Sequence, residues 1–244
     1  TVAAINLQEN PDNTYLQVSH RGVWAMIDHW IAFDPAYAEM VFRHACGWEP
    51  SPKGSAYAAW IASKSGFKPV IHANWEMQGV HLDLGLAGTS LGHFEEYTDL
   101  DTFDKKLRQM LGDTPGTIGY GGYCEIRPFY TSDHFRDMGA DGPRWRTQHL
   151  GLDLWSPAGE AVYAPLDGIV HSLQNNQGDR NYGTTIILEH QSGDLVFYTL
   201  YGHLSRSALA QLQPGQPVAA GECIARTGTM EENGGWPPHL HFQV

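Results

Sequence analysis

The chain has 244 residues, 42% of them hydrophobic, which is ordinary for a protein large enough to bury most of its unfolded surface. No apolar run approaches the roughly 20 residues needed to span a bilayer, so no membrane span is expected. The net charge of −12, without a basic run to neutralise phosphates, argues against nucleic acid as a partner.

The first part of the chain is expected to be helical. Apolar residues recur at helical intervals from Val23 to Cys46, and Asp34-Pro35 supplies an N-cap and a first-turn proline. A further short helix is expected at Ala56–Ala62, after a loop rich in proline and glycine. We therefore expect a helical segment over residues 1–65, followed by a separate domain over residues 66–244.

The second part has the composition of a β-protein. From about residue 115, glycine and β-branched residues dominate, and turn signals recur about every ten residues, a spacing typical of a sandwich or barrel. A helix over residues 99–111 precedes this region, so the predicted fold class is α+β with a domain core over residues 115–244. The expected strands are Val162–Ala164, Gly168–Val170, Thr184–Leu188 and Leu195–Tyr201.

Two further segments combine an apolar strand face with a face that carries polar groups. In His149–Leu154 the leucines alternate with His149, Gly151 and Asp153. In His239–Val244, Leu240 and its apolar neighbours alternate with two histidines. Each strand should therefore bury one face and present imidazole or carboxylate groups on the other.

These groups have the chemistry of a catalytic zinc site, which uses three nitrogen or oxygen ligands and leaves one position for water. His149 and Asp153 could provide two ligands, and His203, His239 and His241 are the candidates for the third. A nearby histidine that does not bind the ion could handle the proton of the water. His190 and Asp194 repeat the same spacing, but Ser192-Gly193 between them is typical of a hairpin tip, so we interpret that copy as structural.

The segments around these residues, taken together, resemble peptidase family M23, the lysostaphin-type, LytM-like zinc metallopeptidases. The resemblance covers about residues 115–244 and implies an antiparallel β-sheet groove with barrel-sandwich character. Arg127 stands where such proteins often carry an arginine, and its role is left open. The matching segments are His149–Asp153, Gly159–Val170, Ile186–His190, Tyr201–Ser205, Val218–Gly221 and Pro238–Phe242.

The resemblance also implies roles for single residues. It assigns His149, Asp153 and His241 as ligands of Zn²⁺, and His203 and His239 as the catalytic histidines that flank the water. The implied activity is that of an endopeptidase that hydrolyses a peptide bond. Its substrate would be a peptidoglycan stem peptide, a cross-bridge or a small peptide.

The sequences of two segments, Tyr198–Ser205 and Glu232–His239, resemble one subgroup of this family more closely. In these bacterial fusion proteins an M23 module lies between a kinase-like module and a class III aminotransferase module. Residues 1–65 would then be the tail of an upstream module and a linker, with covalent neighbour modules on both sides. The alternative to an enzyme is a non-catalytic or regulatory M23-like module, or a structural linker with an incidental metal site.

The compartment is left open by these observations. Three dispersed cysteines, Cys46, Cys124 and Cys223, predict free buried thiols rather than a disulfide frame, which favours a reducing compartment. No secretion signal follows Thr1, although a signal already removed would leave no trace. The cytoplasm is therefore favoured, with the periplasm or secretion as the alternative because M23 peptidases mostly act outside the cytoplasm.

Overall fold

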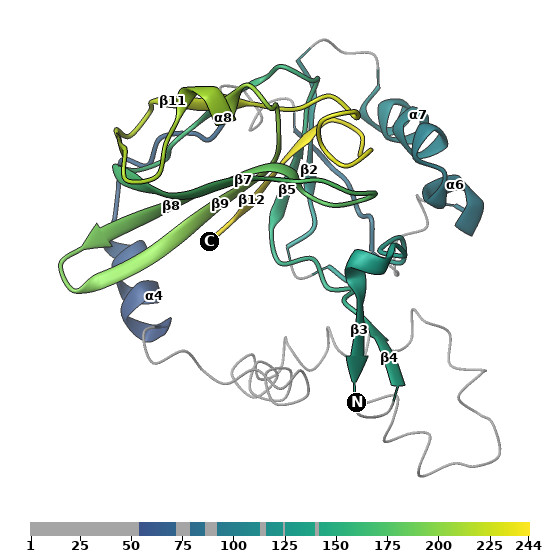
Figure 1. Ribbon diagram of the computed structural model, residues 1–244, viewed down its shortest axis with the longest axis horizontal. Helices are drawn as coiled ribbons and strands as arrows, with labels where there is room; N and C mark the ends of the chain where they lie inside the picture. Colours follow the sequence, from purple (N-terminus) through teal and green to yellow (C-terminus); the bar gives the residue numbers. More distant parts are fainter. Residues whose placement is uncertain (1–53, 72–78, 86–91, 113–115, 124, 140–141) are drawn as a thin grey trace. The chain divides into compact units, whose positions relative to one another are not determined.

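The computed structural model describes residues 54–71, 79–85, 92–112, 116–123, 125–139 and 142–244 (Figure 1). Residues 64–244 form one compact unit. The short helix expected at Ala56–Ala62 is present as α4 (Gly54–Ser63), whereas the helices expected within 23–46 lie outside the described residues. The domain boundary near residue 65 stays a prediction. Among the described helices, none combines the length and apolar character needed to cross a membrane.

An eight-stranded sheet forms the centre of the compact unit, and its long strands lie side by side in Figure 1. In spatial order the strands are β1 (Gly79–His81), β2 (Ile118–Gly121), β5 (Leu152–Trp155), β12 (His239–Gln243), β9 (Leu195–Leu204), β8 (Gly183–Ser192), β7 (Gly168–Asn176) and β10 (Pro217–Val218).

Smaller elements surround this sheet. Two additional sheets have two strands each, β11 (Cys223–Arg226) with β6 (Ala161–Tyr163) and β3 (Arg136–Gly139) with β4 (Gly142–Trp145). Within the described residues, the helices of the unit are α6 (Phe94–Thr98), α7 (Leu100–Leu111), α8 (Ala208–Gln211) and a 3₁₀ turn at Asp133–Phe135.

The expected mostly-β fold with a few helices is confirmed, with two differences. The sheet is mixed, because β1 and β2 are parallel. The chain between them contains α6 and α7, and a crossover of that length is what parallel pairing requires. The sheet is also open, with β1 and β10 as its edges in the described part of the chain, so no closed barrel forms.

Local sequence explains the elements that were predicted. The four expected strands coincide with or overlap β6, β7, β8 and β9. At the start of α7, the Asp99 carboxylate accepts a hydrogen bond of 2.8 Å from the amide of Thr102, which is an N-cap. Between β8 and β9, Gly193 has a φ of 60° in a two-residue loop, as a type II′ hairpin turn requires. The hairpin predicted around Ser192-Gly193 is therefore present.

The two faces of β5 pack against different apolar clusters, and this places the polar site. Leu154 belongs to the larger cluster beneath the sheet, together with Leu240 of β12. Trp155 belongs to the smaller cluster, which includes Phe103 and Leu107 of α7. Asp153 and Trp155 therefore share the face opposite the larger core, and cross-strand pairing puts His241 and His239 beside them on that face.

The expectation of buried thiols is wrong for Cys223, the only cysteine within the described residues. Its thiol is free but exposed, because Cys223 is the first residue of β11, whose inner residues are the buried ones.

Candidate metal centre

His149 lies just before strand β5 rather than within it, which differs from the strand expected at His149–Leu154. Its amide donates to the carbonyl oxygen of Glu125 at 2.8 Å, so the chain here is held by the segment after β2. The side chain of Leu150 is 45% exposed, because the regular alternation begins only at Leu152. The position of His149 therefore depends on long-range contacts that local periodicity does not contain.

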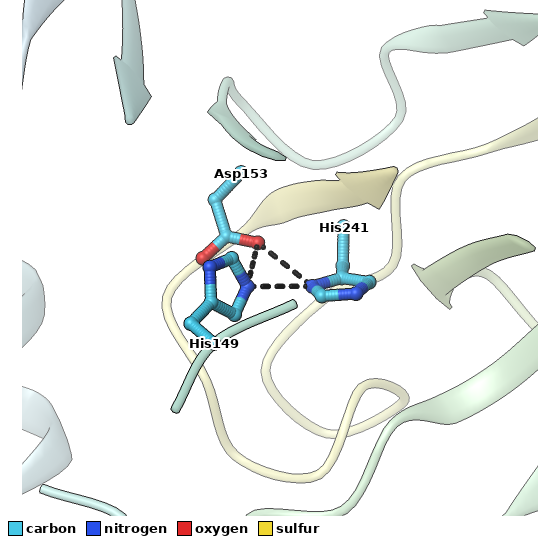
Figure 2. Close-up of side chains that lie close together, drawn as sticks. All are labelled: His149, Asp153 and His241. Atoms are coloured by element: carbon cyan, nitrogen blue, oxygen red, sulfur yellow. Dashed lines mark hydrogen bonds and ion pairs between the residues drawn. The ribbon is translucent and has the colours of Figure 1, made fainter. Parts of the chain in front are cut away.

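The structure brings His149, Asp153 and His241 together (Figure 2). Asp153 of β5 and His241 of β12 are partners in the antiparallel ladder, so their side chains leave the same face of the sheet. Asp153 Oδ1 lies 3.1 Å from His149 Nε2 and 3.1 Å from His241 Nδ1. The two imidazole nitrogens are 2.8 Å apart. All three side chains are buried.

Outer contacts determine which ring nitrogens face this cluster. His149 Nδ1 donates to the carbonyl oxygen of Gly122 at 2.6 Å, and His241 Nε2 lies 3.4 Å from Oε1 of Gln243. In the neutral tautomers that satisfy these acceptors, His149 Nε2 and His241 Nδ1 carry lone pairs. Two lone pairs and a carboxylate oxygen then face one another without a proton between them. Such a triangle of acceptors could hold a metal ion.

The dimensions of the triangle fit a metal ion of the size of zinc. Ligand atoms at zinc distances of about 2.0–2.1 Å lie about 3.3 Å apart when the geometry is tetrahedral, close to the 2.8–3.1 Å found here. Gly151 leaves the necessary space, because a Cβ at this position would lie 2.4 Å from Cε1 of His241. Two histidines and one carboxylate are also a donor set typical of catalytic zinc.

The charge of Asp153 is stabilised from its other side. Oδ2 accepts a bond of 2.5 Å from Nη1 of Arg127, whose side chain is 2% exposed. Burial opposes ionisation, but His149 and Arg127 together hold the pKa of the Asp153 carboxyl well below its usual range. Asp153 is therefore a carboxylate at neutral pH, as a metal ligand must be.

His203 and His239 lie next to this cluster, with ring centroids 4.2 Å apart. His239 Nε2 is 3.8 Å from Asp153 Oδ1, and the ring of His203 lies 6.3 Å from that of His241. The backbone of His203 has a φ of 62°, which is uncommon for residues other than glycine.

Both rings are oriented so that one nitrogen can accept a proton. His203 Nδ1 donates to the carbonyl oxygen of Asn233 at 3.0 Å, and His239 Nδ1 donates to that of Pro237 at 2.7 Å. The neutral rings therefore carry their lone pair on Nε2. Burial lowers the pKa of His239 to about 4, and burial together with His239 and His241 lowers that of His203 well below its usual value. Both histidines are neutral at neutral pH.

The second copy of the His-x-x-x-Asp spacing takes no part in this cluster. His190 is 2% exposed, and its ring bonds to the carbonyl oxygen of Asp167 at 2.8 Å and to Oγ1 of Thr199 at 2.7 Å. Both ring nitrogens are thus occupied by neighbours from β9 and the turn before β7.

Several side chains at the site were not assigned a role from the sequence. Trp155 stacks on His239 with ring centroids 4.1 Å apart, and Tyr182 lies 5.4 Å from the ring of His203. From the sequence, Arg127 was noted only as an arginine at a position where M23 proteins often carry one, and it was given no role. Trp155 is the ladder partner of His239, so its place at the site can be read from the strand pattern once the pairing of β5 with β12 is known.

Parts of this chain are similar to solved structures of peptidases. A zinc containing peptidase from Vibrio cholerae is 29% identical over 49% of this chain and 32% of its own, with a TM-score of 0.32. The catalytic domain of the antimicrobial peptidase lysostaphin from Staphylococcus simulans is 28% identical over 40% of this chain and 66% of its own, with a TM-score of 0.30. A mutant catalytic domain of the prophage-encoded M23 protein EnpA from Enterococcus faecalis is 21% identical over 54% of this chain and 81% of its own, with a TM-score of 0.33.

The chain thus spans about a third of the length of the first of these relatives. A search among curated proteins gives no match. The model of peptidase family M23 matches residues 147–244, the segment that holds His149, Asp153, His203, His239 and His241. Residues 147–244 are therefore similar to peptidase family M23.

Proposed function

We propose that this chain is a zinc metallo-endopeptidase, with His149, Asp153 and His241 as the ligands of the ion. The observation that carries the proposal is the triangle of buried acceptor atoms, 2.8–3.1 Å apart. The other ring nitrogen of each of the two histidines is already occupied by a hydrogen bond. Zinc in such a site lowers the pKa of a water molecule toward neutrality and polarises a peptide carbonyl.

The protein's own part in the reaction is proton transfer and orientation. Nε2 of His239 and Nε2 of His203 are the free acceptors nearest the cluster, because both Nδ1 atoms donate to backbone carbonyls. One of them takes the proton of the attacking water on Nε2 and can then deliver it to the leaving amine, while the other accepts a hydrogen bond that orients the water. The burial that keeps both rings neutral makes them available as acceptors at neutral pH.

The proposed substrate class rests on the similarity to peptidase family M23. M23 peptidases act on peptidoglycan peptides, and a stem peptide or a glycine-rich cross-bridge is the first candidate here. A small peptide is the second candidate, because the resemblance to the central module of fusion proteins would place the domain beside metabolic modules. That resemblance, with residues 1–65 as the end of an upstream module, remains part of the proposal.

The test is cleavage of a defined peptide set by the full chain loaded with zinc. The set contains pentaglycine, peptidoglycan stem peptides and dipeptides, and products are identified by mass spectrometry. Cleavage that disappears with a chelator, returns with zinc and is absent in Asp153→Ala is the expected result. If the zinc-loaded protein cleaves nothing while Asp153→Ala loses the metal, a non-catalytic or regulatory module is the better explanation.

A further inference from the structure

Arg127 carries a buried charge that contacts a candidate metal ligand directly. Its guanidinium donates from Nη1 to Asp153 Oδ2 at 2.5 Å, and from Nε to Glu125 Oε2 at 2.7 Å. Nη1 also lies 3.1 Å from the hydroxyl of Tyr130. The rings of Phe129 and Tyr130 lie 5.6 and 5.9 Å from the guanidinium carbon. The orientation of Arg127 is therefore fixed by contacts on several sides.

The two oxygens of Asp153 consequently have different partners. Oδ1 faces the two imidazole nitrogens, at 3.1 Å from each, whereas Oδ2 faces Arg127. A carboxylate held in this way cannot rotate to offer both oxygens to an ion without losing its bond to the guanidinium. The arrangement selects one oxygen of Asp153 as the ligand atom.

Stability alone is a poor explanation for this arginine. Burying a guanidinium carries a large desolvation penalty, and an apolar side chain of similar volume is often equally stable in such a place. In addition, Nη2 has no acceptor among the residues that the structure describes. A protein that needed only a well-packed core here would gain by replacing Arg127.

From these contacts we propose that Arg127 is a positioning residue, which holds Asp153 so that it binds the metal ion through Oδ1 alone. The proposal rests on the metal site proposed above. Arg127 lies before the segment 147–244 that matches the family model, so the match does not include it. Gly122, which accepts from His149, lies in the same preceding segment. The ligand geometry of the domain thus depends on residues upstream of the matched segment.

The test compares metal binding by the wild type, Arg127→Met and Arg127→Lys. The dissociation constant for zinc is measured by competition with a chromophoric chelator, on protein shown by circular dichroism to be folded. Loss of an outer contact to a metal ligand typically weakens metal binding about 10- to 100-fold, and we expect this for Arg127→Met. Arg127→Lys keeps the charge but loses the fork of donors, so its dissociation constant should lie between the other two.

A second readout follows the geometry directly. In the cobalt-substituted protein, the visible absorption bands report the coordination of the ion. A change from one to two bound oxygens of Asp153 in Arg127→Met should alter their position and intensity. A role of Arg127 in packing alone would leave these bands unchanged.

Arg180→Met is the matched control. Arg180 is also buried and bonds to the carbonyl oxygen of Phe129 and to Thr131 of the same segment, but it contacts none of the three candidate ligands. Its loss should leave the zinc dissociation constant of the folded protein within about twofold of the wild type, since none of its contacts reaches a ligand.

The proposal is overturned if folded Arg127→Met binds zinc as the wild type does, or if Arg180→Met weakens zinc binding equally. Should Arg127→Met fail to fold, Arg127→Lys decides in the same way, because wild-type affinity with wild-type cobalt bands would exclude a positioning role. A wild type that binds no zinc would instead refute the proposed metal site itself.

Discussion

The indole of Trp155 stacks on the imidazole of His239, with ring centroids 4.1 Å apart and an angle of 27° between the planes. The two residues are direct partners in the ladder between β5 and β12. The indole also makes a T-shaped contact with Phe103 of α7, with ring centroids 6.0 Å apart. His239 is thus held by a stacked ring and by its bond to Pro237. The orientation of its free Nε2 depends on both.

Replacing Trp155 by leucine should lower turnover without releasing the metal. The leucine leaves the imidazole of His239 free to tilt, and misplacement of a catalytic group by about 1 Å can cost about 10²-fold in rate. Trp155→Phe keeps an aromatic ring against His239 and should retain most of the activity. The measurements are kcat on a cleaved peptide and metal content by elemental analysis. Equal kcat for the leucine and phenylalanine variants would show that the stacking has no catalytic role.

The three candidate ligands should be individually necessary for metal binding. His149→Ala, Asp153→Ala and His241→Ala each remove one of the acceptor atoms that face one another at 2.8–3.1 Å. We expect each variant to contain well under half an equivalent of zinc after purification in its presence. His190→Ala is the control with a matched motif, and it should keep its zinc. Loss of zinc from His190→Ala but not from His149→Ala would show that the other copy of the motif binds the metal.

His203→Ala and His239→Ala should separate metal binding from turnover. Neither ring belongs to the triangle of acceptors, so both variants should keep the ion. Removal of a general acid or base typically costs about 10²–10⁴-fold, and we expect kcat to fall by that amount in each case. Release of the metal from His239→Ala would instead make His239 a ligand and leave proton transfer to His203 alone.

The polar residues of the site could be found from the sequence because each lies in a strand or motif with its own local pattern. Alternation predicted that Asp153 and His241 lie on the polar faces of their strands, and the resemblance to family M23 assigned them as ligands. Their pairing in the ladder is known only from the structure. Local pattern could not place His149, which is positioned by the carbonyl oxygens of Glu125 and Gly122. Those contacts join segments more than 20 residues apart, and alternation carries no information about them.

The open sheet was missed for the same reason. Strand β1 has only three residues, too few for a period of two to be recognised. Its parallel pairing with β2 depends on the path of the chain through α6 and α7. Composition identified the fold as mostly β, but it could not show which strands would form the edges of the sheet.

His190 should make the protein less stable as the pH falls. Burial lowers the pKa of His190, so the native state resists the proton that the unfolded chain accepts. The contribution is fully present above the unfolded pKa of about 6.5 and is lost as the pH falls below it toward the native value. The free energy of unfolding of the wild type should therefore decrease between pH 7.5 and 5.5. In His190→Gln the free energy of unfolding should decrease less over this pH range. The variant keeps every other histidine of the wild type, so parallel curves for the two proteins would contradict the effect assigned to His190.

Residues 1–65 should not be needed for the metal site. A truncated protein that begins at residue 66 keeps the contacts that join the start of the compact unit to β6 and to the turn after it. These are the bond from the Lys68 amide to the carbonyl oxygen of Pro165 at 3.0 Å and the bridge between Ile71 and Val162. We expect it to be soluble and to bind one equivalent of zinc as the full chain does. Failure to bind zinc in folded form would show that the upstream segment completes the domain.

A shorter protein that begins at residue 147, where the family match starts, should behave differently. It lacks β2, whose Gly121 pairs with Asp153, and it lacks Gly122 and Arg127, which contact His149 and Asp153. Without β2, strand β5 becomes an edge strand that pairs only with β12. Two of the three candidate ligands, His149 and Asp153, also lose their hydrogen bonds to Gly122 and Arg127. We expect this protein to be insoluble or to bind zinc at least about tenfold more weakly than the protein from residue 66. The two truncated proteins are compared by competition with the same chelator, and equal affinity would mean that the matched segment is sufficient to build the site.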